Sequence, residues 1–242
     1  MRLVVIAGVV LFIGANVLLT ALRARTYPSY WRDRMNELVA PDAVQLVAFG
    51  DSSVQAIGAE QPLDGYVGRI AGYIEARTRR PVHISNVSHG GTTRDIVDRQ
   101  LPKVDLRSAH LVVVGSANDM EQRAPLAQYR ADLTALLDLL PADRTVISDL
   151  PLFPGRDAYQ AILEQEADAR RIRRADFGAV FGSSARRLDI FSWLPPHLNS
   201  RGYGYWFEAF RPAVEQVIAQ WSPESSSGPF SSSDRGHAKL AD

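Results

Sequence analysis

Two hydroxyls and a carboxylate stand where an apolar run of the sequence ends. The stretch QLVAFGDSSVQAIGA, residues 45–59, has the pattern of a buried strand up to Gly50, after which Asp51, Ser52 and Ser53 interrupt it. Side-chain oxygens at such a point commonly cap a helix, because they accept hydrogen bonds from its first N–H groups. The same position would present Ser52 as a nucleophile, provided that a base and oxyanion donors lie elsewhere in the chain.

Candidates for these partners occur in three later segments. NVSHGGTT (residues 86–93) offers a glycine-rich backbone with the N–H of Gly90, and VGSANDM (114–120) offers the carboxamide of Asn118. PPHLNSRGYGYW (195–206) contains His197, whose imidazole could take the proton of Ser52 because it titrates near neutral pH. A nucleophile, a base and two N–H donors are the groups that serine acyl chemistry requires.

The rest of the sequence indicates how these groups could meet. Apolar, β-branched runs alternate with stretches of helical spacing, which is typical of βαβ units. We expect an α/β fold, a three-layer α/β/α sandwich around a parallel five-stranded sheet in the flavodoxin-like order 2-1-3-4-5. In that order the segments after the first and third strands lie at one edge of the sheet. The predicted strands are 44–50, 82–88, 110–116, 145–150 and a weaker 178–181, and the main helices are 63–77, 126–140 and 202–221.

On these motifs, the chain resembles the SGNH or GDSL-type hydrolase family over roughly residues 44–221. GDS resembles the first family block with Ser52 as nucleophile, HGGTT the second with Gly90 as a donor, and AND the third with Asn118 as a donor. HLNSRGY resembles the last block, with His197 as base. The resemblance implies a serine hydrolase that cleaves carboxylic esters through an acyl-serine, with Ser52, Gly90 and Asn118 forming the oxyanion hole. It implies an acyl ester of a small molecule, lipid or glycan as substrate, and no cofactor.

Two positions depart from the family pattern. Ser116 stands where the third block usually has glycine, and Leu194 stands three residues before the histidine, where the family has an aspartate. Leucine cannot accept the imidazole N–H, so either another acceptor, such as Asp189 or a backbone carbonyl within residues 193–196, replaces the aspartate, or the activity is low. We expect the backbone carbonyl. Leu194 also favours an alternative, a catalytically weakened membrane-tethered module that binds a ligand, and an acyltransferase with the same acyl-serine chemistry is a third possibility.

The N-terminal residues predict a membrane anchor. Leu3 to Leu22 carries no charge and has the ~20 residues that a helix needs to cross a bilayer. A cleaved signal peptide is the alternative, but the apolar stretch exceeds the usual length and no clean cleavage site follows. The four arginines at 23, 25, 32 and 34 favour a cytoplasmic C-terminal side, whereas an exported hydrolase would need the reverse, so the sequence leaves the side of the cell membrane open.

We therefore divide the chain into an anchor (1–22), a juxtamembrane linker (23–42), an SGNH-type hydrolase domain (43–221) and a Ser-rich tail expected to be disordered (222–242). In the linker, Tyr27, Tyr30 and Trp31 could lie at the membrane interface. The weaker fifth strand is expected to end near Asp189, and the run RRIRR from Arg170 to form the solvated side of a helix.

Composition excludes several other classes of function. The 27 basic and 27 acidic residues balance to a net charge of zero, which is not the pattern of a nucleic-acid-binding protein. The absence of cysteine excludes disulfides, thiolate metal sites and a cysteine nucleophile. No clustered set of His, Asp and Glu suggests a metal site. The sequence leaves the oligomeric state open.

Overall fold

The structure, a computed structural model, describes residues 2–182, 188–194 and 196–221. Its centre is a parallel five-stranded sheet in the order β2-β1-β3-β4-β5, which confirms the predicted fold class and strand order. The expected tail, 222–242, lies outside the described residues. The strands are β1 (Val44–Gly50), β2 (Val82–Asn86), β3 (Leu111–Gly115), β4 (Thr145–Ser148) and β5 (Arg173–Ala175).

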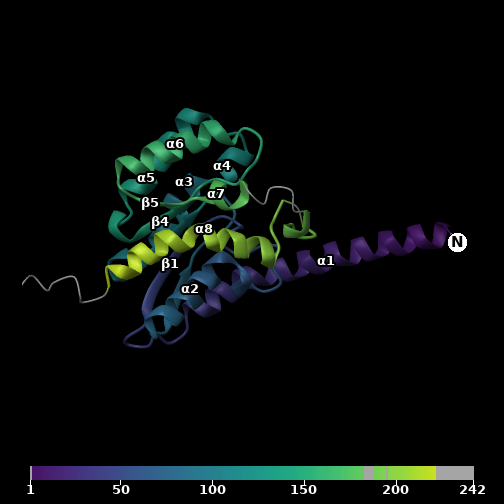
Figure 1. Cartoon of the computed structure of the whole chain (residues 1–242), viewed down its shortest axis with the longest axis horizontal. Coiled ribbons are helices and arrows are strands. Elements are labelled where there is room, and N and C mark those ends of the chain that lie inside the picture. The colour runs from purple at the N-terminus through teal and green to yellow at the C-terminus, as the bar shows by residue number, and fades with distance from the viewer. Residues whose placement is uncertain (1, 183–187, 195, 222–242) are drawn as a thin grey trace, which may run out of the picture.

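Helices cover both faces of this sheet (Figure 1). The α-helices are α1 (Arg2–Met35), α2 (Tyr66–Thr78), α3 (Thr93–Asp95), α4 (Asn118–Glu121), α5 (Leu126–Asp138), α6 (Arg156–Ala169), α7 (Phe177–Gly182) and α8 (Ser200–Ala219). Short helical turns are η1 (Pro62–Asp64), η2 (Ile96–Gln100), η3 (Leu101–Lys103), η4 (Leu106–Ser108), η5 (Ala142–Arg144) and η6 (Leu188–Ile190). The predicted main helices correspond to α2, α5 and α8.

Alternation along β1 divides the core into two layers. Leu46 and Ala48 pack with α2 and α8 on one face, whereas Val47 and Phe49 pack with α5 and α6 on the other. Successive strand side chains point to opposite faces, so a central strand that is covered on both sides must be apolar throughout. This explains why the run that precedes the Gly-Asp-Ser segment is continuous in the sequence.

The fifth strand lies elsewhere than predicted. Residues 178–181 belong to α7, and the strand is Arg173–Ala175, which pairs with β4. The prediction of a helix for the arginine run from Arg170 is therefore wrong for the residues in β5. A three-residue edge strand carries too little pattern to be read from the sequence, and charged side chains are common at sheet edges because they discourage pairing with other chains.

Helix α1 is continuous through the predicted anchor and most of the predicted linker. Tyr27 and Trp31 are only 3% and 2% exposed, so the prediction that their rings contact a membrane interface is wrong, and both rings pack inside the domain. The hydroxyl of Tyr27 donates to the Ala59 carbonyl at 2.7 Å, and Nε1 of Trp31 donates to the Gln55 carbonyl at 3.1 Å. The second half of α1 is therefore part of the folded domain.

The first half of α1 projects from the domain with its apolar side chains exposed (Figure 1). The helix is long and apolar enough over Ile6–Met35 to cross a membrane, and its most apolar window has a mean hydropathy of 2.0 and no buried residues. A signal sequence has the same properties. An N-terminal apolar helix compatible with either role is thus present.

Candidate active site

The turn that holds Ser52 begins at the end of β1, where Gly50 lies against Gly115 of β3. Gly50 pairs with Gly115 in the strand register and has a φ of +144°, a conformation that other residues rarely adopt. A Cβ on Gly50 would lie 1.8 Å from the Gly115 carbonyl oxygen. Glycine before the Asp-Ser pair is therefore a steric requirement of the turn.

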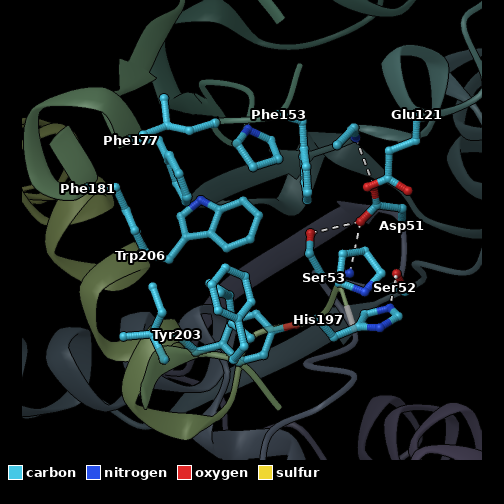
Figure 2. Close-up of a pocket in the computed structure, with 17 residues that line it drawn as sticks. Asp51, Ser52, Ser53, Glu121, Phe153, Phe177, Phe181, His197, Tyr203 and Trp206 are labelled. Atoms are coloured by element: carbon cyan, nitrogen blue, oxygen red, sulfur yellow. Dashed lines mark hydrogen bonds between the residues drawn. The ribbon is translucent and has the colours of Figure 1, made fainter. Parts of the chain in front are cut away.

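Asp51 holds the turn together. Its carboxylate accepts hydrogen bonds from the Ser53 backbone N–H at 2.9 Å, the Ser53 hydroxyl at 2.8 Å and the Ala117 backbone N–H at 2.8 Å. The side chain is buried, and these bonds connect the segments that follow β1 and β3. Figure 2 shows the Asp51 carboxylate directed toward these turn groups. No helix begins at this motif, because residues 51–61 form turns and bends, so Asp51 and Ser53 stabilise a turn and do not cap a helix.

A glutamine that the sequence analysis did not single out fixes the preceding peptide. The fully buried Gln100 accepts a hydrogen bond from the Gly50 N–H and donates one to the Gly50 carbonyl, each at 2.8 Å. The same carbonyl also accepts from the N–H of His89 at 3.1 Å. Gln100 lies fifty residues beyond Gly50, and nothing in its local sequence distinguishes it from a surface glutamine.

Ser52 and His197, 145 residues apart in sequence, lie in hydrogen-bond contact. The Ser52 Oγ is 3.0 Å from Nε2 of His197, and Nδ1 of the same ring is 2.9 Å from the carbonyl oxygen of Leu194. A carbonyl can only accept, so Nδ1 carries the proton. The lone pair of Nε2 then faces the hydroxyl of Ser52 (Figure 2).

The Asp189 carboxylate is engaged elsewhere. It forms an exposed ion pair with Arg201 in the first turn of α8, and the Asp189 backbone carbonyl accepts from the side chain of Asn199 at 2.7 Å. Asp189 lies in η6 and not at the end of a strand, contrary to expectation. Nδ1 of His197 therefore has the backbone carbonyl of Leu194 as its partner, and the Asp189 carboxylate accepts from Arg201 instead.

The loop that carries His197 is short and internally bonded. We call residues 191–194 and 196–198 the His197 loop; its ends, Phe191 and Leu198, form an antiparallel bridge. The Ser192 N–H donates to the His197 carbonyl at 2.9 Å, and the Ser192 hydroxyl contacts both the carbonyl and the N–H of Leu194 at 3.2 and 3.1 Å. These bonds orient the carbonyl that faces the imidazole.

Two residues after His197 dock this loop onto the domain. A Cβ on Gly202 would lie 2.6 Å from the Ile190 carbonyl, so glycine permits α8 to approach the loop. The buried Tyr203 donates from its hydroxyl to the Ile57 carbonyl at 2.8 Å, which ties α8 to the segment after Ser52. The Gly-Tyr pair that follows the histidine thus places the His197 loop beside the Ser52 turn.

The proposed oxyanion donors lie at the ends of β2 and β3. The Asn118 carboxamide donates from Nδ2 to the Gly91 carbonyl at 2.7 Å, which fixes it beside the Gly90–Gly91 turn and leaves its second N–H available. Among the residues that the structure describes, the backbone N–H groups of Ser52 and Gly90 have no protein acceptor. Buried Asp119 joins the same two segments by accepting from Thr93 N and Oγ1, at 2.8 and 2.7 Å.

A pocket of about 310 Å³ opens beside Ser52 and His197. Its size is at the low end for small-molecule sites. Apolar side chains form most of its wall, and Figure 2 shows a group of aromatic rings across the pocket from the serine and the histidine. Gly90 and Asn118 lie outside this lining, so the apolar cavity and the donor groups are distinct parts of the site. The apolar lining includes Phe153, Phe177, Phe181, Ile190, Leu198 and Trp206.

The described residues contain no group of three or more His, Asp and Glu side chains positioned to hold a metal ion. The other three histidines of the described chain have other partners: His83 and His110 contact backbone and side-chain groups around β1, and His89 contacts the Gly90 carbonyl. Burial, with a smaller effect of two arginines, lowers the pKa of His110. These groups are structural features of the sheet and its loops.

Comparisons with known proteins agree with the fold. The model of the GDSL-like lipase/acylhydrolase family matches residues 48–205, which include Ser52, Gly90, Asn118 and His197. A comparison with curated protein sequences finds no match.

Several solved structures have the same fold. TesA gives a TM-score of 0.60 at 16% identity and covers 72% of this chain and 99% of its own. The lipase Lip_vut3 from a goat rumen metagenome gives 0.58 at 20% identity, with 71% and 97% covered. A catalytic mutant of an acetylxylan esterase from Geobacillus stearothermophilus gives 0.57 at 18% identity, with 73% and 96% covered. The family match over more than half of the sequence, together with this fold, establishes that the chain belongs to the GDSL-like lipase/acylhydrolase family, the SGNH type of hydrolase.

Proposed function

We propose that the protein cleaves carboxylic esters through an acyl-serine intermediate on Ser52. The observation that carries this proposal is the chain of contacts from Ser52 Oγ to His197 Nε2, at 3.0 Å, and from His197 Nδ1 to the Leu194 carbonyl, at 2.9 Å. A hydroxyl whose proton can pass to an imidazole held in the correct tautomer is an activated nucleophile.

In the first half of the reaction, Ser52 Oγ attacks the ester carbonyl carbon while Nε2 of His197 accepts its proton. The negative charge that develops on the carbonyl oxygen would be stabilised by the N–H groups of Ser52 and Gly90 and by the Asn118 carboxamide. The C–O bond to the alcohol then breaks, and His197 returns the proton to the departing alcohol oxygen. Water, deprotonated by His197, releases the acid and restores the Ser52 hydroxyl by the same steps in reverse.

The Leu194 carbonyl takes the position that a carboxylate has in a catalytic triad, as the acceptor of the imidazole N–H. It holds the proton on Nδ1 and orients the ring, but its partial charge stabilises the imidazolium less than a full negative charge would. The intact contact between Ser52 and His197 favours catalysis over a weakened module that only binds ligands. Transfer of the acyl group to a hydroxyl other than water uses the same residues.

The pocket supports an apolar acyl group as the part of the substrate that it binds. Its wall is mostly aromatic and aliphatic, and the serine and histidine stand at one side of it (Figure 2). The structural neighbours include one protein named a lipase and one named an acetylxylan esterase, so different kinds of esterase share this fold. The apolar lining favours the lipid-like ester.

We propose further that the first half of α1 anchors the protein in a membrane. Its apolar residues are exposed, whereas Tyr27 and Trp31 in the second half of the same helix are buried in the domain. Deletion of residues 1–22 should therefore release a folded, soluble domain that keeps these two side chains. Recovery of intact full-length protein in the soluble fraction would contradict the anchor.

The catalytic proposal is tested by reaction with a fluorophosphonate probe, which forms a covalent bond with an activated serine. We expect labelling of the purified protein at Ser52, found by mass spectrometry of its peptides, and loss of both labelling and p-nitrophenyl ester hydrolysis in Ser52→Ala. Ser53→Ala is the matched control, because Ser53 is the adjacent hydroxyl and bonds to Asp51. Full ester turnover in Ser52→Ala, or labelling at another serine, would refute the assignment.

A further inference from the structure

Both partners of the Ser52–His197 contact are attached to α1. On the Ser52 side, Tyr27 and Trp31 donate to the carbonyls of Ala59 and Gln55, which belong to the segment directly after Ser52. On the His197 side, the ring of Trp193 in the His197 loop meets the ring of Phe12 edge to face, with centroids 5.8 Å apart. Figure 1 shows the segment before α8 lying over the projecting part of α1.

These contacts fix the height of the site along the helix. At ~1.5 Å of rise per residue, Tyr27 lies roughly 8 Å beyond Leu22, the end of the apolar segment, whereas Phe12 lies about 15 Å before it. The interfacial layer of a bilayer adds only ~5–8 Å outside each side of the hydrocarbon core. With α1 spanning the bilayer as proposed above, Tyr27 and Trp31 would hold the Ser52 turn near the level of the interface. The Phe12 contact would place the tip of the His197 loop alongside the middle of the apolar segment.

The surface of the site at this level is apolar. Phe191 is 44% exposed and Trp193 45% exposed, and Phe191 also lines the pocket, as does the 46% exposed Leu152. Charged groups lie at the base of the loop, where Asp189 and Arg201 form their exposed pair. The loop thus has aromatic side chains at its tip and charges at its base, in the same order as the acyl and headgroup layers of a bilayer.

We propose that the His197 loop contacts the bilayer that holds α1, and that the pocket takes its ester substrate directly from the adjacent lipid leaflet. This inference rests on the anchor and the esterase activity proposed above. The occupant of the apolar surface is lipid, because the surface is continuous, through Phe12 and Trp193, with the exposed apolar side chains of α1. Ester groups of membrane lipids lie at the interface, at the height where Tyr27 and Trp31 hold the Ser52 turn.

The position of the loop is tested by labelling single cysteines in the full-length protein. The chain has no cysteine, so each variant carries one reactive thiol. Trp193→Cys, Leu11→Cys and Leu139→Cys are labelled with bimane and reconstituted in phosphatidylcholine vesicles that contain a doxyl-labelled phosphatidylcholine. Leu11 is an exposed residue of the apolar segment, and Leu139 is an exposed apolar residue at the end of α5, which serves as the matched control.

We expect lipid quenching at position 193 to reach at least half of that at position 11, with little quenching at position 139. Quenching at 193 no greater than at 139 would overturn the proposed membrane contact. If the surface instead served to bind a soluble partner protein, it would lie outside the bilayer in these vesicles, and quenching at 193 would be as low as at 139.

The source of the substrate is tested by comparing two esters with the same reconstituted protein. We measure turnover of a fluorogenic glycerolipid ester in the vesicle and of dissolved p-nitrophenyl acetate, and take their ratio. Trp193→Asp should lower this ratio by about tenfold, because a carboxylate resists entry into lipid, whereas Leu139→Asp should leave the ratio unchanged. Uptake from the leaflet would be overturned by an unchanged ratio in Trp193→Asp. It would also be overturned if the wild-type protein hydrolysed the dissolved ester but not the glycerolipid ester.

These outcomes are separate from a failure of the proposed esterase. Turnover of both esters that survives Ser52→Ala would refute the nucleophile and, with it, the use of the pocket for lipid. The quenching experiment does not depend on turnover, so it still reports whether the His197 loop lies in the bilayer.

Discussion

Replacement of Asp189 by asparagine distinguishes a backbone acceptor from a carboxylate acceptor for His197. In the structure, the Asp189 side chain is 49% exposed and pairs with Arg201, which is 64% exposed. Exposed ion pairs of this kind contribute about 0.2–1 kcal/mol to stability, and this pair makes no contact with the imidazole. We therefore expect Asp189→Asn to change kcat for a p-nitrophenyl ester by less than about twofold.

The alternative predicts a far larger effect. If Asp189 held the tautomer of His197, its amide would cost about 10⁴-fold in kcat, as measured for the aspartate of a serine protease triad. The assay is ester turnover of wild type, Asp189→Asn and Arg201→Gln, with a urea unfolding curve for each. Arg201→Gln is the control, because it breaks the same ion pair from the other side. A loss of 100-fold or more in Asp189→Asn alone, at unchanged stability, would refute the backbone assignment.

The structure also sets the activity expected of the wild type. A hydrogen bond to a charged acceptor contributes about 1.5–3 kcal/mol, and one to a neutral acceptor about 0.5–1.5 kcal/mol. A difference of ~1–1.5 kcal/mol in the transition state corresponds to about tenfold in rate. The protein should thus be roughly tenfold slower than a comparable enzyme with a triad carboxylate, and much faster than one with a misoriented imidazole.

Three further predictions follow from individual contacts. Asn118→Ala should lower kcat by about 10²–10³-fold with little change in KM, measured by steady-state kinetics, and an effect on KM alone would exclude an oxyanion role. Gly50→Ala should destabilise the fold by at least ~3 kcal/mol in urea unfolding because its Cβ meets a carbonyl, whereas Gly72→Ala, with open space around it, should not; equal stabilities would contradict the steric argument. Burial lowers the pKa of His110, so the folded state binds fewer protons than the unfolded state and loses stability as pH falls below about 6.5. Unfolding curves at about pH 7.5 and 5.5 should show that the free energy of unfolding changes less with pH in His110→Gln than in the wild type. An equal change in both proteins would assign the pH dependence to other groups.

The meeting of distant groups could be predicted because the topology is regular. Parallel strands end at one edge of the sheet, and the order 2-1-3-4-5 makes the first and third strands neighbours. This rule alone predicts that the segments of Ser52, Gly90 and Asn118 lie together. The position of His197 before the last helix, together with the resemblance to known hydrolases, predicts its place beside Ser52.

Other features have no signal in a single sequence. Gln100 is fully buried against Gly50, but its local pattern is that of any exposed glutamine. Tyr27 and Trp31 follow an apolar segment, as interfacial aromatic residues do. Their partners in the domain are backbone carbonyls, and because every residue has a carbonyl, the sequence does not mark these partners. The three-residue strand β5 is held by its pairing with β4 and not by its own composition. In each case a tertiary contact decides the outcome.

The hydrogen bond between His197 and the Leu194 carbonyl has a consequence for how the site can vary. A carboxylate acceptor depends on the identity of one side chain, so almost any substitution there removes it. A carbonyl is present in every residue, so position 194 can change its side chain while the acceptor persists. The site depends instead on the backbone conformation of the loop. In the sequence a proline follows Leu194, and a residue before proline has fewer backbone conformations available. Mutational scanning should therefore show broad tolerance at Leu194 and low tolerance for insertions or deletions between Ser192 and His197.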